Sequence, residues 1–462
     1  MERFIGKCLS LTKMIIHPEA VNCISLGHFL LAATILSIIL LTLVYFRASY
    51  VYLVDFVCYL PPDNLGASVA KFIKHVELCN HFDKEEMNFQ VKVFERSGIG
   101  PDACMPPSLH KIPADTSLES TREEIEIVLF TVVNDLLSKH KVDPQSIDFL
   151  VSNCSLFCPT PSITSMVTNK FGFRNNIKSF NLSGMGCSAG MVSICLAKDL
   201  LRVHKNTTAL VLSMEAVTPN GYRGKRKSML ISNTLFRMGG AAILLSNKKK
   251  DKQRAKYKLQ HLVRTHMGSN HQAYQSVFQK PDEEGYVGVS LSRDLLQVAA
   301  KALTTNISAL GPLVLPYSEQ IRYGWSWITK KIWPPAKGKE VYVPNFKKAF
   351  EHFCIHAGGK AVIDAVEKSL KLQKEDGEAS RMTLYRFGNT SSSSVWYELN
   401  YLEAKGKVKR GDRVWQIAFG SGFKCNSAVW KCISEIDPKA GSAWSDRIHL
   451  YPVDTGVPDV SS

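Results

Sequence analysis

Along the chain, short continuous apolar runs alternate with segments in which apolar residues recur every three or four positions. This alternation predicts strands that alternate with helices. Short apolar runs predict strands at 147–153, 208–213, 241–246, 258–263 and 415–419. From Ser120 to His140 the apolar residues recur every three or four positions, which predicts a helix capped by Thr121. Another helix is expected at 360–370. Strands that alternate with helices indicate a layered α/β architecture.

One apolar stretch differs from these runs in length and in charge. Residues 23–46 contain no Asp, Glu, Lys or Arg, and about 20 apolar residues are enough to cross a bilayer. The stretch is longer than the core of a signal peptide and has no obvious cleavage site flanked by small residues. We therefore predict an uncleaved transmembrane anchor rather than a signal peptide. The charges on its two sides do not decide its orientation.

The segment 313–337 combines tryptophan with basic residues. Trp325, Trp327 and Trp333 are three of the seven tryptophans of the chain, and lysine and arginine surround them. Two interpretations are open. The segment is either an amphipathic surface helix packed on the protein or a membrane-contacting flap, because tryptophan together with lysine and arginine suits the headgroup boundary.

Composition narrows the class of protein. The chain has 462 residues, of which 45% are hydrophobic and 21% charged, and this is typical of a globular protein with a large core. Its formal net charge of +16 favours an acidic partner. We find no nucleic-acid module, so phosphates of a cofactor or of lipid headgroups fit better. The 12 cysteines form no regular framework and no zinc-binding spacing, which indicates a reducing compartment and no metal.

Cys187 stands out as a candidate nucleophile. It follows Gly184 and Gly186 in a glycine-rich turn that opens into an apolar helix. A helix N-terminus lowers the pKa of a thiol, and the thiolate is the attacking species. Small neighbours leave room for a substrate carbonyl. The alternative is a buried structural cysteine, since buried cysteines usually behave as small hydrophobes.

Two later stretches supply polar groups that suit a nucleophilic cysteine. His352 and His356 lie four residues apart in a short predicted strand that ends at a Gly-Gly turn, so both side chains face the same side. Asn389 begins a small polar cluster, Asn-Thr-Ser-Ser-Ser-Ser, that precedes an apolar helix. Alone, such a histidine is more often structural, and such a cluster is more often a helix cap. The three stretches together indicate a catalytic site much more specifically than any one of them does alone.

These stretches resemble the plant 3-ketoacyl-CoA synthases, the membrane-bound condensing enzymes of very-long-chain fatty acid elongation. The resemblance rests on GMGCSAG, HFCIHAGG, RFGNTSSSS and GSGFKCNSAVW, and it runs from about Val51 to about Pro452. It implies a thiolase-like fold of two similar halves in five αβαβα layers, with an N-terminal transmembrane helix. It divides the chain into an N-terminal segment 1–22, the anchor 23–46, a half with the nucleophile 47–250, a half with His and Asn 251–452, and a tail 453–462.

The resemblance also implies chemistry and site residues. Acyl-CoA would acylate Cys187, and malonyl-CoA would lose carbon dioxide to give an enolate that attacks the acyl group. His356 and Asn389 would donate hydrogen bonds to the enolate oxygen, because a carboxylate there would repel it. The backbone N–H of Cys187 and one from Gly420, Ser421 or Gly422 would hold the acyl oxyanion. His352 would either support His356 or simply be a buried residue. His266 matches a histidine of the family. The residues after His266 depart from the family pattern.

Partners and location follow from the same resemblance. No cofactor or metal is implied beyond the substrates acyl-CoA and malonyl-CoA. The implied partners are a second copy of the chain, membrane lipid, and the reductases and dehydratase of an elongase complex. The implied location is the endoplasmic reticulum membrane, with the catalytic part in the cytosol. Asn181-Leu-Ser and Asn389-Thr-Ser are glycosylation sequons inside the catalytic blocks, and lumenal exposure would risk their modification.

Three rival classes remain to be distinguished. A papain-like hydrolase carries tryptophan soon after its cysteine, which GCSAGM does not. A chalcone-type polyketide synthase shares the Cys-His-Asn set but has neither the anchor nor the elongase-type blocks. A catalytically silent scaffold is disfavoured by the intact Cys187, His356 and Asn389. An assay with malonyl-CoA and several acyl-CoAs separates the three.

Overall fold

The computed structural model describes residues 26–45, 50–80, 82–332 and 341–454. The chain divides into two units, 1–49 and 50–462. In the first unit the structure describes one helix, α2 (Leu26–Tyr45). No helix in the described part of the chain is long and apolar enough to cross a membrane. The expected anchor at 23–46 includes residues outside the described ranges, and it stays a prediction.

The second unit is built on one mixed sheet of nine strands in the order β3-β2-β4-β5-β1-β6-β11-β10-β9, and on a separate hairpin of β7 and β8. Central strands such as β4 and β5 are buried along their whole length, which explains why their sequences are continuous apolar runs. The strands are β1 (Tyr52–Cys58), β2 (Phe149–Asn153), β3 (Lys178–Leu182), β4 (Thr208–Met214), β5 (Gly240–Ser246), β6 (Tyr257–His266), β7 (Val277–Pro281), β8 (Val287–Leu291), β9 (His352–Ile355), β10 (Arg413–Gly420) and β11 (Lys424–Cys432).

The sheet repeats its own topology on the two sides of the β1–β6 pair. Counted outward from this pair, β1, β5, β4 and β2 are joined by antiparallel, antiparallel and parallel pairing. On the other side, β6, β11, β10 and β9 are joined in the same sequence of directions. Among the described strands, β3 has no counterpart. The chain therefore builds the same arrangement twice, although the two sequences share no visible identity.

Two helices lie between the two sides of the sheet, and others cover the outside. The inner helices are α7, which contacts β2, β4 and β11, and α14, which contacts β9, β10 and β1. On the outer faces, α5 packs on β1 and β5, and α10 packs on β6 and β11. The helices of this unit are α3 (Val69–Cys79), α4 (Lys84–Arg96), α5 (Leu118–His140), α6 (Ile163–Phe171), α7 (Ala189–Val203), α8 (Lys227–Leu235), α9 (His271–Gln275), α10 (Leu295–Val314), α11 (Tyr317–Ile332), α12 (Lys360–Leu370), α13 (Glu378–Phe387) and α14 (Ser394–Ala404). Helices and sheet halves thus alternate in layers.

The long helix α5 begins earlier than the sequence predicted. Its cap is Ser117, whose hydroxyl accepts the backbone N–H of Ser120, and the helix starts at Leu118. Thr121 lies inside the first turn, where its hydroxyl donates to the carbonyl of Ser117. The prediction of Thr121 as the cap was wrong because serine and threonine both suit a cap, and sequence alone does not choose between neighbouring positions.

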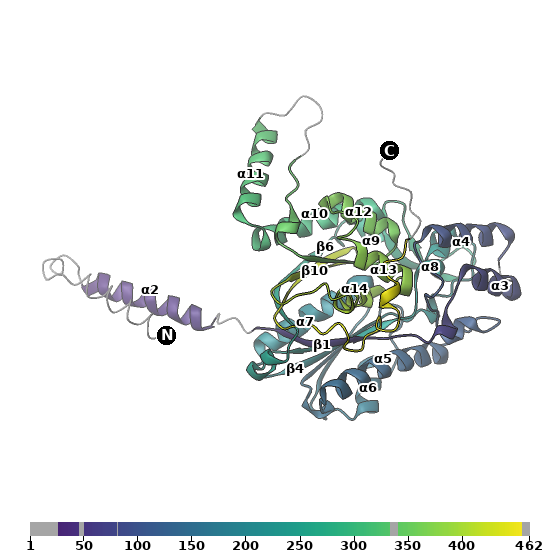
Figure 1. Ribbon diagram of the computed structural model, residues 1–462, viewed down its shortest axis with the longest axis horizontal. Coiled ribbons are helices and arrows are strands. Elements are labelled where there is room, and N and C mark those ends of the chain that lie inside the picture. Colours follow the sequence, from purple (N-terminus) through teal and green to yellow (C-terminus); the bar gives the residue numbers. More distant parts are fainter. Residues whose placement is uncertain (1–25, 46–49, 81, 333–340, 455–462) are drawn as a thin grey trace. The chain divides into compact units, whose positions relative to one another are not determined.

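Helix α11 projects away from the layers (Figure 1). Its inner side is held by Glu319, a buried carboxylate that accepts the Tyr342 hydroxyl at 2.6 Å and the Asn345 backbone N–H at 2.9 Å. The large apolar side chains of the helix are on the outside. Trp325 is 70% exposed and Trp327 48%. Trp333, named with them in the sequence, lies outside the described residues.

Candidate active site

Cys187 sits where the sequence placed it, in a tight turn at the start of a helix. The turn is the 3-10 segment Gly186–Ser188, and α7 begins at the next residue. Gly186 has a φ of +63°, a conformation that is costly for residues with a side chain. A side chain at this position would also lie 2.5 Å from the backbone nitrogen of Ser421. Only glycine allows the turn to approach the end of β10 so closely.

The side chains of Cys187, His356 and Asn389 line one cavity of about 300 Å³. They come from three parts of the chain. Cys187 precedes α7, His356 follows β9, and Asn389 precedes α14. The two inner helices therefore point their N-terminal ends at the same space. The sequence predicted this convergence from the three motifs, and the structure brings the three residues together.

His356 is held at the end of the sheet as a neutral base. Its backbone N–H donates to the carbonyl of Ile417 at 2.9 Å, which continues the pairing of β9 with β10. The ring is 4% exposed, and burial lowers the pKa of His356 to about 4, so the imidazole is uncharged at neutral pH. Its Nδ1 atom is buried without a hydrogen-bond partner. At Nδ1, therefore, no hydrogen bond fixes the tautomer of the ring.

Asn389 is oriented by hydrogen bonds of its side chain and of its backbone. Its Oδ1 accepts the backbone N–H of Ser391 at 2.8 Å, its Nδ2 donates to the carbonyl of Gly358 at 3.3 Å, and its carbonyl accepts the backbone N–H of Arg237. Ser391 adopts a φ of +56°, which is uncommon for a residue with a side chain and costs energy. Because Oδ1 is occupied, the amide presents an N–H donor to the cavity.

The Cys187 thiol does not have the lowered pKa that its helix position suggested. Burial raises its pKa to about 12, and the negative charge of Glu215 acts in the same direction. The neighbouring Ser391 side chain lowers the pKa of Cys187 but does not outweigh these effects. The prediction was wrong because it considered the helix and not the loss of solvent around the sulfur. At neutral pH the cavity holds an uncharged thiol beside an uncharged imidazole.

The glycine-rich end of β10 packs directly on the nucleophile turn. Gly420, Ser421 and Gly422 line the same cavity as Cys187. A side chain at Gly420 would lie 2.7 Å from the backbone nitrogen of Ser188 and 2.6 Å from the carbonyl of Met185. The two turns are thus in close contact at the cavity, and their backbone N–H groups are the candidates for an oxyanion site.

His266 and His352 are outside the group of residues that line the cavity. His266 ends β6, is exposed, and hydrogen-bonds the carbonyl of Gly422, so it contacts the back of the glycine turn. His352 begins β9 and hydrogen-bonds Asp412, with 2.9 Å between Nε2 and Oδ2. The expected support of His356 by His352 is therefore not what the structure shows. Four residues of strand separate the two rings by about 13 Å.

Sequence reasoning missed Glu215, which also lines the cavity. Its Oε1 accepts the backbone N–H groups of Ser155 and Leu156, each at 2.8 Å, and its Oε2 accepts the Ser391 hydroxyl at 3.4 Å. Burial raises the pKa of this carboxyl. Glu215 ties the loop after β2 to the loop before α14. A charged residue directly after the buried strand β4 was the available signal.

Much of the remaining cavity wall is apolar. It is formed largely by the β7–β8 hairpin and the first turns of α10, through Val277, Phe278, Val289, Leu291, Leu295 and Ala299. These residues make a surface for a hydrocarbon chain next to the reactive groups. In the described part of the chain no group of His, Cys, Asp or Glu could hold a metal ion. Cys187, His356 and Asn389 beside an apolar wall fit acyl transfer to sulfur followed by stabilisation of an enolate or oxyanion.

Comparison with known proteins agrees with this chemistry. The family model described as FAE1/Type III polyketide synthase-like protein matches residues 43–332, and the model of the 3-oxoacyl-[acyl-carrier-protein] synthase III C-terminal region matches 347–432. Among curated proteins, 3-ketoacyl-CoA synthase 7 of Arabidopsis thaliana is 60% identical over 97% of this chain and 96% of its own. 3-Ketoacyl-CoA synthase 5 of the same plant is 52% identical over 94% of this chain and 89% of its own.

Solved structures support the fold. A fungal type III polyketide synthase matches with a TM-score of 0.63 at 20% identity, over 83% of this chain and 99% of its own. The 1,3,6,8-tetrahydroxynaphthalene synthase of Streptomyces coelicolor A3(2) matches with a TM-score of 0.61 at 16% identity, with the same coverage. At these identities the likeness concerns the fold alone. It is the thiolase-like α/β fold expected from the sequence.

Proposed function

The chain belongs to the 3-ketoacyl-CoA synthase family, and from this premise we propose that Cys187, His356 and Asn389 carry out its reaction. The protein is a condensing acyltransferase. It joins a long-chain acyl-CoA to malonyl-CoA, releases carbon dioxide and forms 3-oxoacyl-CoA in very-long-chain fatty acid elongation. The observation that carries the assignment of residues is the common cavity of three side chains from distant motifs.

The first half-reaction is transfer of the acyl group to Cys187. The neutral His356 imidazole takes the thiol proton as the sulfur attacks the thioester carbonyl, since the thiol itself is protonated at neutral pH. The negative charge moves to the carbonyl oxygen, which faces backbone N–H groups of Cys187 and of the turn after Gly420. The carbon–sulfur bond to coenzyme A then breaks, and the leaving thiolate takes the proton from His356.

The second half-reaction forms the carbon–carbon bond. The bond between the carboxylate and the methylene carbon of malonyl-CoA breaks, carbon dioxide leaves, and the electron pair passes into an enolate. The enolate oxygen accepts hydrogen bonds from the Asn389 amide and from His356, whose tautomer is not fixed by Nδ1. The enolate carbon attacks the acyl carbonyl and expels the Cys187 thiolate. A proton from solvent, passed through His356, restores the thiol.

A direct test uses purified full-length protein with malonyl-CoA and a series of acyl-CoAs. The expected product is 3-oxoacyl-CoA, and Cys187→Ser abolishes its formation because an alcohol is far less ionised than a thiol. Cys158→Ser is the matched control, because Cys158 is exposed and does not line the cavity. Condensation by Cys187→Ser at the rate of the control would refute the assignment. A short polyketide product would instead favour the polyketide synthase alternative.

We also propose that the protein works on the endoplasmic reticulum membrane with its catalytic unit in the cytosol. The apolar run 23–46 supports an anchor. Helix α11 supports a second contact, because its exposed apolar side chains form one stripe at helical spacing, made of Tyr317, Ile321, Trp325, Ile328 and Ile332. Arg322, Lys330 and Lys331 on the same helix complement anionic lipid headgroups.

Two measurements test the membrane proposal. Protease treatment of sealed microsomes is expected to remove the catalytic unit, and protection of this unit would reverse the proposed topology. For α11, a Trp325→Ser and Ile321→Ser double variant is expected to bind anionic vesicles more weakly than the wild type. Leu450→Ser removes an exposed apolar side chain elsewhere and serves as the control. Equal binding of both variants would rule out α11 as the contact.

The predicted partners are proposed on the basis of the family alone. If the protein is a homodimer, the particle purified in detergent should have twice the mass of one chain. If it belongs to an elongase complex, a reductase or a dehydratase should co-purify with it. A monomer that condenses at full rate would refute the need for a dimer.

A further inference from the structure

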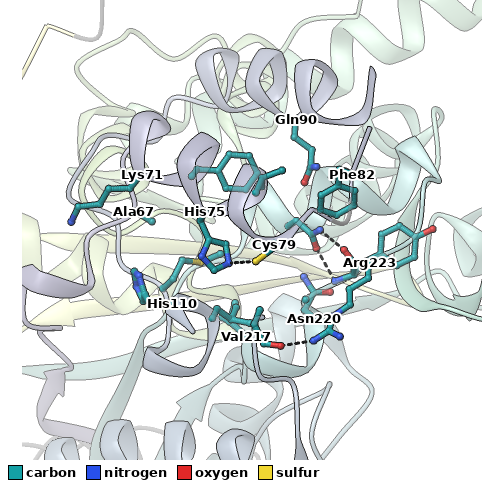
Figure 2. A pocket seen from close by; sticks show the side chains of 18 of the residues that line it. Ala67, Lys71, His75, Cys79, Phe82, Gln90, His110, Val217, Asn220 and Arg223 are labelled. Carbon is teal, nitrogen blue, oxygen red and sulfur yellow. Dashed lines mark hydrogen bonds between the residues drawn. The ribbon is translucent and has the colours of Figure 1, made fainter. Parts of the chain in front are cut away.

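A second cavity is lined by residues of helices α3 and α4 and of the segment 217–223 (Figure 2). Its volume is about 120 Å³, enough for several water molecules or a stretch of hydrocarbon chain. Much of its wall is apolar, with Phe72, Val76 and Leu109 as examples. Of the described residues that line it, none also lines the catalytic cavity. It is therefore a separate space.

Polar atoms in the wall of this second cavity lack partners. Gln90 is fully buried, and neither its Oε1 nor its Nε2 has a hydrogen-bond partner. Figure 2 shows it among the side chains that line the cavity, to which α4 contributes it. Asn220 Oδ1 and Arg237 Nε are buried without a partner as well. Unpaired buried polar atoms cost free energy, which a bound ligand with hydrogen-bonding atoms would recover.

The wall of the second cavity is also positively charged. Among its described residues none is Asp or Glu, whereas Lys71, Arg223 and Arg237 are present. The Lys71 ammonium and the Arg223 guanidinium bond only neutral backbone carbonyls, those of Gly66 and Ala114. No carboxylate offsets their charge at these contacts.

Arg237 is the most buried of the three cations. Its guanidinium is 2% exposed, donates from Nη1 to the carbonyl of Phe236 at 2.8 Å, and lies 5.2 Å from the centre of the Phe94 ring. Burial lowers the pKa of this guanidinium to about 10, so it keeps its charge at neutral pH. A buried cation without a counter-ion is strongly disfavoured. An anion at this position would remove that cost.

We propose that the second cavity binds the head of a fatty carboxylate, with the carboxylate at Arg237 and Gln90 and the first carbons of the chain against the apolar wall. A volume of about 120 Å³ holds only this part, so the remainder of a longer chain leaves the cavity on the side where Cys79 is partly exposed. The charge selects an anion, the apolar wall selects a chain, and the unpaired Gln90 amide supplies a further donor. The site is close to the chemistry, because the backbone N–H of Arg237 donates to the carbonyl of Asn389 at 2.9 Å. It is nevertheless independent of the catalytic assignment, so either proposal can fail alone.

Cys79 provides a readout within the cavity. It lines the cavity from α3 next to His75 and is partly exposed, whereas Cys158 is exposed and outside it. The full-length wild-type protein is treated with N-ethylmaleimide, and modification is followed separately for the two cysteines by mass spectrometry. Palmitate is expected to protect Cys79 and not Cys158. It should do so at a concentration at least about tenfold lower than 1-hexadecanol, because the alcohol lacks the charge.

A variant then tests the residue assignment. Arg237→Gln is expected to remove the preference for palmitate over hexadecanol, and Gln90→Leu to reduce it while keeping the cavity apolar. The comparison of acid with alcohol on the wild type requires no variant and stands even if Arg237→Gln fails to fold. Failure of palmitate to protect Cys79 overturns the proposal. Equal protection by the alcohol, or full preference retained in a folded Arg237→Gln protein, overturns the role given to the carboxylate.

Discussion

Asn389→Asp separates the two half-reactions, because it changes one atom of the site and almost nothing of its shape. In the wild type, Oδ1 of Asn389 accepts from the backbone of Ser391 and Nδ2 donates to the carbonyl of Gly358. Aspartate keeps the first bond. At the second position it puts an oxygen opposite a carbonyl oxygen 3.3 Å away and presents a negative charge to the cavity.

The size of the effect follows from the role of the amide. Loss of one donor to an oxyanion typically slows a reaction by about 10²–10³, and a carboxylate additionally repels the enolate and the malonyl carboxylate. Decarboxylation of malonyl-CoA is therefore expected to fall by at least about 10²-fold. Acylation of Cys187 uses His356 and backbone N–H groups, so the acyl-enzyme should still form.

The assay measures the two steps separately. Release of labelled carbon dioxide from malonyl-CoA reports decarboxylation, and mass spectrometry of the protein after incubation with acyl-CoA reports acylation. Asn400→Asp is the matched control. Asn400 lies on α14 and, like Asn389, is buried and accepts a backbone N–H through Oδ1, in this case that of Ala443. It does not line the cavity. Decarboxylation at the rate of this control in Asn389→Asp would mean that Asn389 is a helix cap and not an enolate donor.

Three further predictions concern the surroundings of the site. Gly420→Ala should destabilise the protein by about 1–3 kcal/mol and slow condensation, because the added methyl group would lie 2.7 Å from the Ser188 nitrogen. Gly441→Ala is the control: no atom lies close to its added methyl group, so denaturation and activity assays should both show no change. The pKa of His356 is about 4 in the folded protein and about 6.5 in the unfolded chain. The free energy of unfolding should therefore fall by about 3 kcal/mol as the pH decreases from 6.5 toward 4, because the unfolded chain binds the proton first. Denaturation at several pH values should show a smaller decline for His356→Gln than for the wild type, and equal slopes would contradict this. His352→Gln should keep condensation within about twofold while weakening the fold slightly, and a loss of turnover without a loss of stability would restore a catalytic role.

The fold was accessible to sequence reasoning where burial is uniform. β2, β4 and β5 are buried on both faces, so their sequences are nearly uninterrupted apolar runs, and their predicted positions agree with the structure to within about two residues. The repeat of topology around β1 and β6 was not visible, because pairing depends on backbone hydrogen bonds and not on residue identity.

The site was accessible only in part, for a similar reason. Cys187, His356 and Asn389 each follow a local pattern, and the layered fold brings such turns together at one end of the strands. The direction of the Cys187 pKa was not accessible, because the solvent around a side chain depends on residues distant in sequence. The partner of His352 was missed because Asp412 joins it only through the pairing of β9 with β10. The unpaired polar atoms of the second cavity likewise depend on how α4 packs on α8.

The central claim is that the growing chain is attached to Cys187 before the carbon–carbon bond forms. The most direct measurement incubates the purified full-length protein with an acyl-CoA labelled in its acyl group, without malonyl-CoA, followed by acid quenching, digestion and mass spectrometry. The account predicts a hydroxylamine-sensitive label on the peptide that contains Cys187, and its disappearance when malonyl-CoA is added. A label on another cysteine such as Cys154 or Cys195, or condensation without any labelled enzyme, would contradict it.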